Sequence, residues 1–147
     1  MKNKIIIVGN DNFTREAYEK GKFIVYPKKK YLNQLMEEND VVNLSSPSLT
    51  TTKSINMIKA FIETQDFDYC IVSLGKADEN NGLNAAEIEN NLQIIINVLI
   101  SRGIVPVLCN PYNYEIDTQL STIVERVKNK YNLKTTLKSL GLKTQFA

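Results

Sequence analysis

The chain has 147 residues, of which 43% are hydrophobic and 23% are charged, and its formal net charge is +2. This length suits one domain, residues 1–147, and the composition excludes collagen-like, low-complexity and wholly disordered chains. The sequence contains no histidine, which excludes Ser-His-Asp and Cys-His catalysis and His-ligated zinc or haem within these residues. The small net charge, with the acidic residues gathered between positions 35 and 90, predicts no nucleic-acid partner.

Apolar runs at regular spacing predict five buried β-strands. They cover residues 5–8, 23–26, 41–44, 67–74 and 104–108. Gly9 closes the first run, Pro27 stops the second and Gly75 ends the fourth, because glycine and proline interrupt strands. Pro106 within the last run favours either a strand near an edge of the sheet or the start of a strand.

Between these runs the apolar residues recur at helical spacing. One short helix is predicted over residues 28–38, and three more are predicted around apolar stripes that run over residues 55–62, 88–99 and 116–131. The first should direct Leu32, Leu35 and Met36 inward. A threonine cluster ahead of the second can supply its N-cap. Asn84 is the N-cap candidate for the third helix, and Gly103 ends it.

Strands that are apolar throughout and alternate with amphipathic helices indicate a parallel sheet covered on both faces. With right-handed crossovers, the predicted fold class is α/β, a three-layer α/β/α sandwich in one domain. Ligands of such sheets bind beyond the carboxyl ends of the strands. The candidate site residues are therefore those that follow the strands.

Two cysteines, Cys70 and Cys109, sit inside apolar runs. Buried cysteine packs as a small hydrophobic side chain, so packing is favoured over a disulfide or a nucleophile. The apolar run near the N-terminus is too short for a secretory segment or a membrane span. The sequence predicts a cytoplasmic chain without a membrane partner.

The segments that follow the strands carry short motifs in a fixed order. They are Gly9-Asn10-Asp11, Asn43 with the Ser/Thr run to Thr52, Gly75-Lys76-Ala77-Asp78, and Asn110-Pro111. In order, spacing and helix context these motifs resemble the SGNH (GDSL-like) hydrolase family, over residues 3–131. The resemblance implies a flavodoxin-like, SGNH-type sheet of five parallel strands in the order 2-1-3-4-5, and it implies hydrolysis of esters or acylated sugars.

The motifs depart from the family's pattern at the catalytic positions. Asp11 stands in the place of the nucleophilic serine, and Ala77 in the place of the asparagine that donates to the oxyanion. Ser46 or Ser48 replaces the glycine whose amide completes the oxyanion hole, and no Asp-x-x-His precedes Ala147. Set against the resemblance, these departures predict a scaffold that has lost the serine esterase mechanism and serves as a ligand- or partner-binding module.

An active hydrolase that uses Asp11 and Asp78 in altered roles is the alternative. Two neighbouring carboxylates can act as an acid/base pair, and Asp11 could itself attack as a nucleophile. Against this, aspartate between a strand and a helix commonly caps the helix or forms a turn. The pair could also hold a divalent cation with Glu79, but no ligand spacing supports a metal, and no cofactor is predicted.

The predicted pocket would take a small ester or a carbohydrate-like molecule. Its members are Gly9, Asn10, Asn12, Ser46, Ser48, Gly75, Lys76, Ala77, Asn110 and Tyr112. Lys76 either binds an anionic ligand or is solvated, and the serines either take part in chemistry or cap the following helix. Tyr112 either lines the pocket or covers the surface. The sequence leaves a protein partner open.

Overall fold

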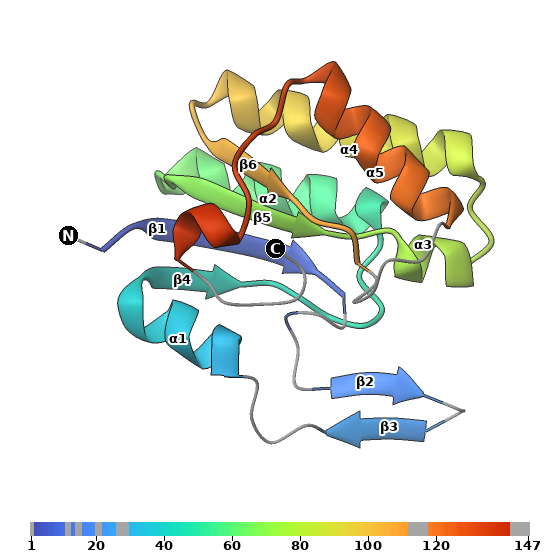
Figure 1. The fold of residues 1–147 in the computed structure, drawn as a ribbon, viewed down its shortest axis with the longest axis horizontal. Coiled ribbons are helices and arrows are strands. Elements are labelled where there is room, and N and C mark those ends of the chain that lie inside the picture. Colours follow the sequence, from blue (N-terminus) through green and yellow to red (C-terminus); the bar gives the residue numbers. More distant parts are fainter. Residues whose placement is uncertain are drawn as a thin grey trace.

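The central sheet has four parallel strands in the order β4-β1-β5-β6 (Figure 1). The structure is a computed structural model that describes residues 2–10, 13, 16–19, 22–25, 30–111 and 118–141. Its sheet strands are β1 (Lys4–Gly9), β4 (Asp40–Asn43), β5 (Tyr69–Ser73) and β6 (Val105–Leu108). β1 pairs with β4 on one side and β5 on the other, and Gly9 lies opposite Ser73 at the carboxyl end.

The described part of the chain holds no fifth parallel strand, which corrects the prediction for residues 23–26. Residues 22–25 form β3 (Lys22–Val25), which pairs antiparallel with β2 (Glu16–Glu19) in a separate two-stranded sheet. Two residues separate β2 from β3 in the sequence, whereas parallel neighbours need a crossover of a dozen or more residues. The two segments therefore pair as a hairpin, and β4 takes the place beside β1 that the run at 23–26 was expected to fill.

Helices cover both faces of the four-stranded sheet, and the predicted α/β/α sandwich is confirmed. One face packs against α2 (Thr51–Thr64), α4 (Ala85–Ser101) and α5 (Gln119–Lys130). The opposite face packs against α1 (Lys30–Glu38) and the end of the described chain, which includes the 3₁₀ turn η2 (Lys138–Leu140). The short helix α3 (Lys76–Asn80) follows β5 at the carboxyl end of the sheet (Figure 1).

Strand β1 lies at the centre of both hydrophobic layers. Ile6 and Val8 belong to the cluster under α2, α4 and α5, whereas Ile5 and Ile7 belong to the cluster on the opposite face. All four side chains are fully buried, and each contributes about 1.5–3 kcal/mol relative to an exposed position. A strand buried on both faces has no polar side to show, which is why its sequence lacks the alternation of a half-exposed strand.

Capping contacts confirm three of the predicted helix boundaries. The side chain of Thr50 accepts a hydrogen bond from the Lys53 N–H (3.3 Å) at the start of α2. The side chain of Asn84 accepts one from the Glu87 N–H (2.9 Å) at the start of α4. Gly103, with φ of 71°, follows the end of α4 in the left-handed conformation that favours glycine.

Helix α1 packs through a narrower face than the sequence predicts. Leu32 and Leu35 are buried, but 49% of Met36 is exposed, so its predicted inward position is wrong. The helix contacts β4, which is an edge strand of the sheet. A helix over an edge can cover only part of its circumference with the sheet, and Met36 lies on the part that extends into solvent.

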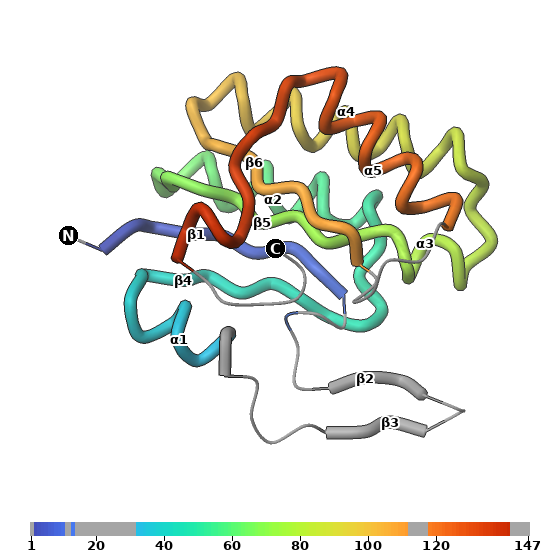
Figure 2. Tube along the Cα trace, in the orientation of Figure 1, coloured from blue at the N-terminus to red at the C-terminus, as the bar shows by residue number. Residues whose placement is uncertain are grey.

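The end of the described chain passes from one face of the sheet to the other (Figure 2). Leu133 packs against the cluster under α4 and α5, whereas Leu137 is buried in the cluster on the opposite face with Val107 and Cys109. The sequence left this segment undetermined. Its two leucines hold residues 133–137 against the sheet.

The two cysteines pack as the sequence predicts, and they lie on opposite faces. Cys70 belongs to the cluster under α2 and α4, and Cys109 belongs to the cluster under α1 and η2. Both are free and buried. Burial raises the pKa of the Cys109 thiol to about 12, and burial likewise raises the pKa of the Cys70 thiol. These thiols are structural side chains of the core.

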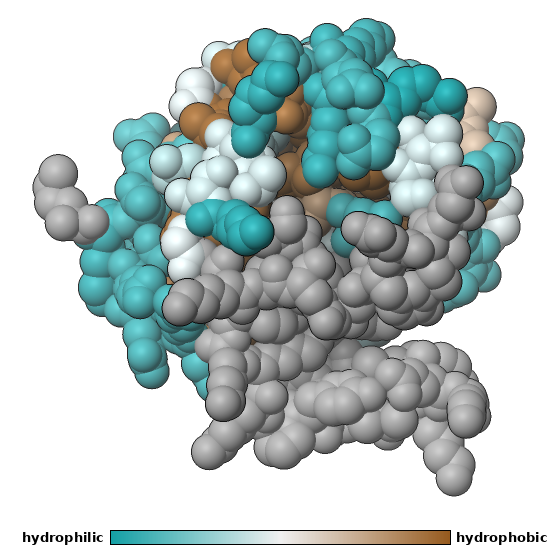
Figure 3. All heavy atoms as spheres, viewed as in Figure 1, coloured by the Kyte–Doolittle hydropathy of each residue, from teal (hydrophilic) through white to brown (hydrophobic). Residues whose placement is uncertain are grey.

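On the face seen in Figure 3, the coloured surface is largely polar, with apolar side chains showing in the hollows between polar ones. The large apolar side chains that the structure exposes are Met36, Ile100 and Val105. Among the described helices, none combines the length and the apolar character that a membrane crossing requires.

Candidate functional site at the carboxyl ends of the strands

Five of the predicted site residues form a buried, hydrogen-bonded group, which we call the strand-end cluster. They are Gly9, Asn10, Gly75, Ala77 and Asp78. They come from the end of β1, from the turn after β5 and from α3. The parallel order of the sheet brings these segments together, because the carboxyl ends of neighbouring parallel strands share one edge.

Asn10 joins the first strand to the loop that follows β4. Its side chain, of which 1% is exposed, donates to the carbonyl oxygens of Ser46 (3.0 Å) and Leu49 (2.8 Å). Its backbone N–H donates to the Ser73 carbonyl at the end of β5 (3.0 Å). One amide side chain thus bridges two carbonyls of the loop between β4 and α2. Asn10 serves to hold the loops together.

The glycines of the cluster allow close approach of neighbouring segments. A Cβ at Gly9 would lie 3.3 Å from the Ser45 Oγ. That hydroxyl is buried, and within the described part of the chain it has no hydrogen-bond partner. Gly75 has φ of 122°, and a Cβ there would lie 2.6 Å from the Leu120 Cδ1. Glycine is therefore required at position 75 by both conformation and packing.

Asp78 binds the first residue of helix α2. The residue is fully buried, and its Oδ1 accepts a hydrogen bond from the Thr51 N–H (2.9 Å), while its Oδ2 accepts one from the Thr51 hydroxyl (2.5 Å). Asn91 of α4 donates from its side chain to the same hydroxyl oxygen (3.0 Å). The carboxylate also lies at the positive end of the α2 dipole. Asp78 therefore holds α3 against α2.

Ala77 has no side-chain hydrogen-bond donor. It is 1% exposed, and its backbone N–H points to the Asn10 Oδ1 at 3.5 Å, the long limit of a hydrogen bond. Its carbonyl accepts from the Asn81 side chain (2.7 Å). Both backbone polar groups of Ala77 thus have partners within the protein, Asn10 for the N–H and Asn81 for the carbonyl.

Ser46 and Ser48 bond within their own turn. Their hydroxyl oxygens lie 3.1 Å apart, and the Ser46 Oγ accepts from the Ser48 N–H (3.3 Å). The N-cap of the following helix is Thr50, so the expectation that the serines cap α2 is not met. Ser48 is exposed and Ser46 is half-buried.

The remaining predicted site residues divide into two groups. Lys76 and Asn110 are half-buried at the carboxyl ends of β5 and β6. Asp11, Asn12 and Tyr112 lie outside the described residues. The pairing of Asp11 with Asp78 therefore stays a prediction. In the described ranges, no three Cys, Asp or Glu residues gather closely enough to hold a metal ion.

Sequence reasoning missed Thr51, which donates to Asp78, and Asn91, which donates to the Thr51 hydroxyl. The threonine run at positions 50–52 indicated a cap, but it did not show that an aspartate 27 residues away would bind there. Asn91 occupies a polar position beside an apolar helical stripe, a place that is usually solvated. Only the packing of α2 against α4 gives it a partner.

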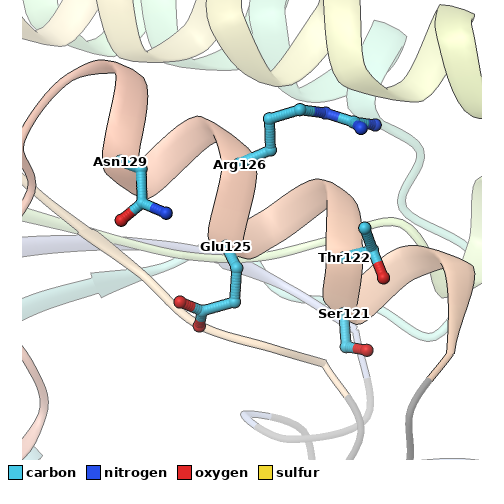
Figure 4. A pocket seen from close by; sticks show the side chains of 5 residues that line it. All are labelled: Ser121, Thr122, Glu125, Arg126 and Asn129. Atoms are coloured by element: carbon cyan, nitrogen blue, oxygen red, sulfur yellow. The ribbon is translucent and has the colours of Figure 1, made fainter.

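Two pockets lie away from the strand-end cluster. The larger has a volume of about 460 Å³ and is lined on α5 by Ser121, Thr122, Glu125, Arg126 and Asn129 (Figure 4). In it, Arg126 reaches toward α4, where its Nε donates to Glu89 (2.6 Å). The smaller has a volume of about 160 Å³ and is lined by Ile62, Gln65, Asp66, Phe67, Arg102 and Ile104. Neither lining includes a predicted site residue.

Comparison with protein-family models and with curated protein sequences finds no match. Solved structures do match. AlinE4, an SGNH-hydrolase family esterase, aligns with a TM-score of 0.68 at 25% identity, over 91% of this chain and 75% of AlinE4. The psychrotrophic esterase EstA from Pseudoalteromonas sp. aligns with a TM-score of 0.66 at 15% identity, over 92% of this chain and 77% of EstA.

A member of the lipolytic protein G-D-S-L family from Veillonella parvula DSM 2008 aligns with a TM-score of 0.64 at 15% identity, over 89% of this chain and 75% of that protein. These three neighbours are thus two esterases, one of them of the SGNH-hydrolase family, and a lipolytic protein of the G-D-S-L family. This chain has the α/β fold of the SGNH hydrolases.

Proposed function

We propose that this chain is an SGNH-hydrolase-like module that binds a ligand or a partner at the carboxyl ends of its strands and does not use the serine esterase mechanism. The observation that carries the proposal is the strand-end cluster itself. Where an esterase needs groups directed at a substrate, the side chains of Asn10 and Asp78 are buried and hydrogen-bonded to Leu49 and Thr51 of the neighbouring segment.

The chemistry of the chain supports the loss of the esterase mechanism. Ala77 offers no side-chain donor to an oxyanion, and removal of one such donor typically lowers the rate by about 10²–10³. The sequence has no histidine, so no imidazole within it can take a proton from a hydroxyl nucleophile. Within these residues, one absence concerns the stabilisation of the oxyanion and the other concerns the base.

The contacts of Asp78 argue against the alternative, a hydrolase that uses Asp11 and Asp78. Both carboxylate oxygens of Asp78 accept hydrogen bonds from Thr51, and the residue is fully buried. A general acid or base must reach a substrate atom directly or through one water. Asp78 would have to break its hydrogen bonds to Thr51 before it could reach a substrate atom.

The ligand class we propose is a small ester or a carbohydrate-like molecule with hydroxyl and carbonyl groups. Described polar side chains that follow three of the strands and are half-buried or exposed include Ser48, Lys76 and Asn110. They combine hydroxyl, ammonium and amide groups, which suit a neutral or weakly anionic polar ligand. A protein partner that presents such groups would engage the same edge.

A short-chain nitrophenyl ester assay tests the proposal, with the Asp11→Ala variant beside the unaltered chain. We expect no turnover above the buffer rate from either protein. Turnover that Asp11→Ala abolishes would overturn the proposal in favour of the hydrolase.

A binding experiment tests the second half of the proposal. Ligand-observed NMR with acetylated monosaccharides and short esters should show binding that weakens in Lys76→Ala. Lys59→Ala is the matched control, because Lys59 is an exposed lysine on α2. Equal binding by both variants would remove Lys76 from the site, and an absence of binding by the unaltered chain would contradict the small-ligand proposal.

A further inference from the structure

The turn after α3 contains the one Asn-Gly pair in the sequence, Asn81-Gly82. Asn81 ends α3 and both residues are exposed. Gly82 has φ of 79°, and no atom lies within 4 Å of the position that a Cβ would take. Gly82 therefore places no side chain of its own beside the backbone nitrogen that follows Asn81, and the space that a Cβ would occupy is open.

We propose that Asn81 is a site of spontaneous deamidation, and that its conversion loosens the turn that carries Ala77 and Asp78. The Gly82 backbone nitrogen attacks the Asn81 Cγ, a C–N bond forms, and the Cγ–Nδ2 bond breaks with release of ammonia. Water then opens the cyclic imide at either carbonyl and leaves aspartate or isoaspartate. Water is the co-reactant, and no oxidant or cofactor takes part.

Two hydrogen bonds hold the reacting groups apart in the closed turn. The Gly82 N–H donates to the Glu79 carbonyl (3.0 Å), and the Asn81 side chain donates to the Ala77 carbonyl (2.7 Å). Both belong to α3, which has five residues. So short a helix is not stable by itself and opens at low cost compared with the core. Conversion proceeds from this open form.

Conversion of Asn81 to aspartate or isoaspartate removes the side-chain amide that donates to the Ala77 carbonyl. The Ala77 carbonyl accepts from both the backbone N–H (3.0 Å) and the side chain (2.7 Å) of Asn81. A carboxylate at position 81 would face that carbonyl oxygen without a proton to donate, and it would add negative charge at the C-terminal end of a helix. The turn that holds Asp78 against Thr51 would lose a contact. This inference concerns the chemistry of the turn and is independent of the proposed function.

Incubation of the folded chain in mildly alkaline buffer, followed by peptide mapping by mass spectrometry, tests the first half. Asn80 and Asn132 are internal controls, because both are exposed and neither precedes glycine. We expect Asn81 to convert at least several-fold faster than either control, with isoaspartate among the products. Conversion no faster than at the controls, while the urea-unfolded chain converts at Asn81, would overturn the proposal.

The variant Asn81→Asp tests the second half, with Asn80→Asp as the matched control that adds the same charge one residue away. We expect Asn81→Asp to lower the Tm and to speed hydrogen exchange at the Thr51 amide more than Asn80→Asp does. Equal effects of the two variants would show that the lost donor to Ala77 is irrelevant and would overturn this half.

Discussion

Asp78 and Thr51 form a double hydrogen bond in which one carboxylate of α3 accepts from both the backbone N–H and the hydroxyl at the start of α2. Asp78 follows β5 and Thr51 follows β4. Their pairing therefore holds the segment after β5 against the segment after β4. The resemblance to SGNH hydrolases implies that the catalytic site of the family lies at this edge of the sheet. Here the same edge is stabilised by its own polar groups.

Replacement of Asp78 should destabilise the whole fold. Asp78→Ala leaves the Thr51 N–H and hydroxyl without their acceptor in a buried place, so the free energy of unfolding should fall by about 2–4 kcal/mol. Urea denaturation followed by far-UV circular dichroism measures it. Glu63→Gln, an exposed carboxylate on the same helix α2, is the control. A loss for Asp78→Ala no larger than for Glu63→Gln would contradict the assignment of Asp78 as a structural cap.

Asn10→Asp should lower stability at neutral pH more than at acidic pH. The new carboxylate would face the carbonyl oxygens of Ser46 and Leu49, which now accept from the amide. Only the protonated form of the acid can donate, so the pKa of the new side chain should lie higher in the folded than in the unfolded state. Its stability contribution is then present at low pH and lost as the pH rises through the folded pKa. Equal destabilisation of this variant at both pH values would contradict the observed orientation of the Asn10 side chain.

Gly75→Ala should lower the free energy of unfolding far more than Gly82→Ala does. Both glycines have positive φ, but a Cβ at Gly75 would lie 2.6 Å from the Leu120 Cδ1, whereas a Cβ at Gly82 would meet nothing within 4 Å. Gly82→Ala should lower the free energy of unfolding only by the strain of alanine in a left-handed conformation, about 1–2 kcal/mol. Overpacking should add about 1–3 kcal/mol at Gly75. Thermal unfolding of the two variants checks this order, and a reversed order would refute the packing of α5 against the turn.

The thiols should be unreactive in the folded chain. Burial raises the pKa of Cys109 from its ordinary value of 9.0 to about 12, so little thiolate exists at the pH of a labelling experiment. A chromogenic disulfide reagent should label both cysteines only in denaturant. The same shift implies that Cys109 disfavours the folded state between pH 9.0 and about 12, where the unfolded thiol ionises first. Rapid labelling of the native chain would contradict the described core.

Some of the candidate site could be anticipated from the sequence, because polar turn formers follow each apolar run and parallel sheets bind ligands at that edge. The positions of Gly9, Gly75 and Asp78 at one sheet edge follow from this rule. What each side chain does there could not be anticipated. Asn10 was expected to line a pocket, yet its side-chain amide donates to the backbone carbonyls of Ser46 and Leu49, because the fold brings the loop after β4 within its reach.

By itself the sequence determined the features that depend on neighbouring residues. These are the strands with apolar side chains on both faces, the N-caps at Thr50 and Asn84, and the end of α4 at Gly103. Each depends on residues within a turn of the chain, so periodicity and composition suffice to predict it. Only the tertiary structure decided which segment lies beside β1, that Met36 faces solvent, and that Asp78 binds Thr51. Those outcomes depend on the length of connections and on which surfaces meet, and contacts between residues 27 apart in the chain leave no local pattern to read.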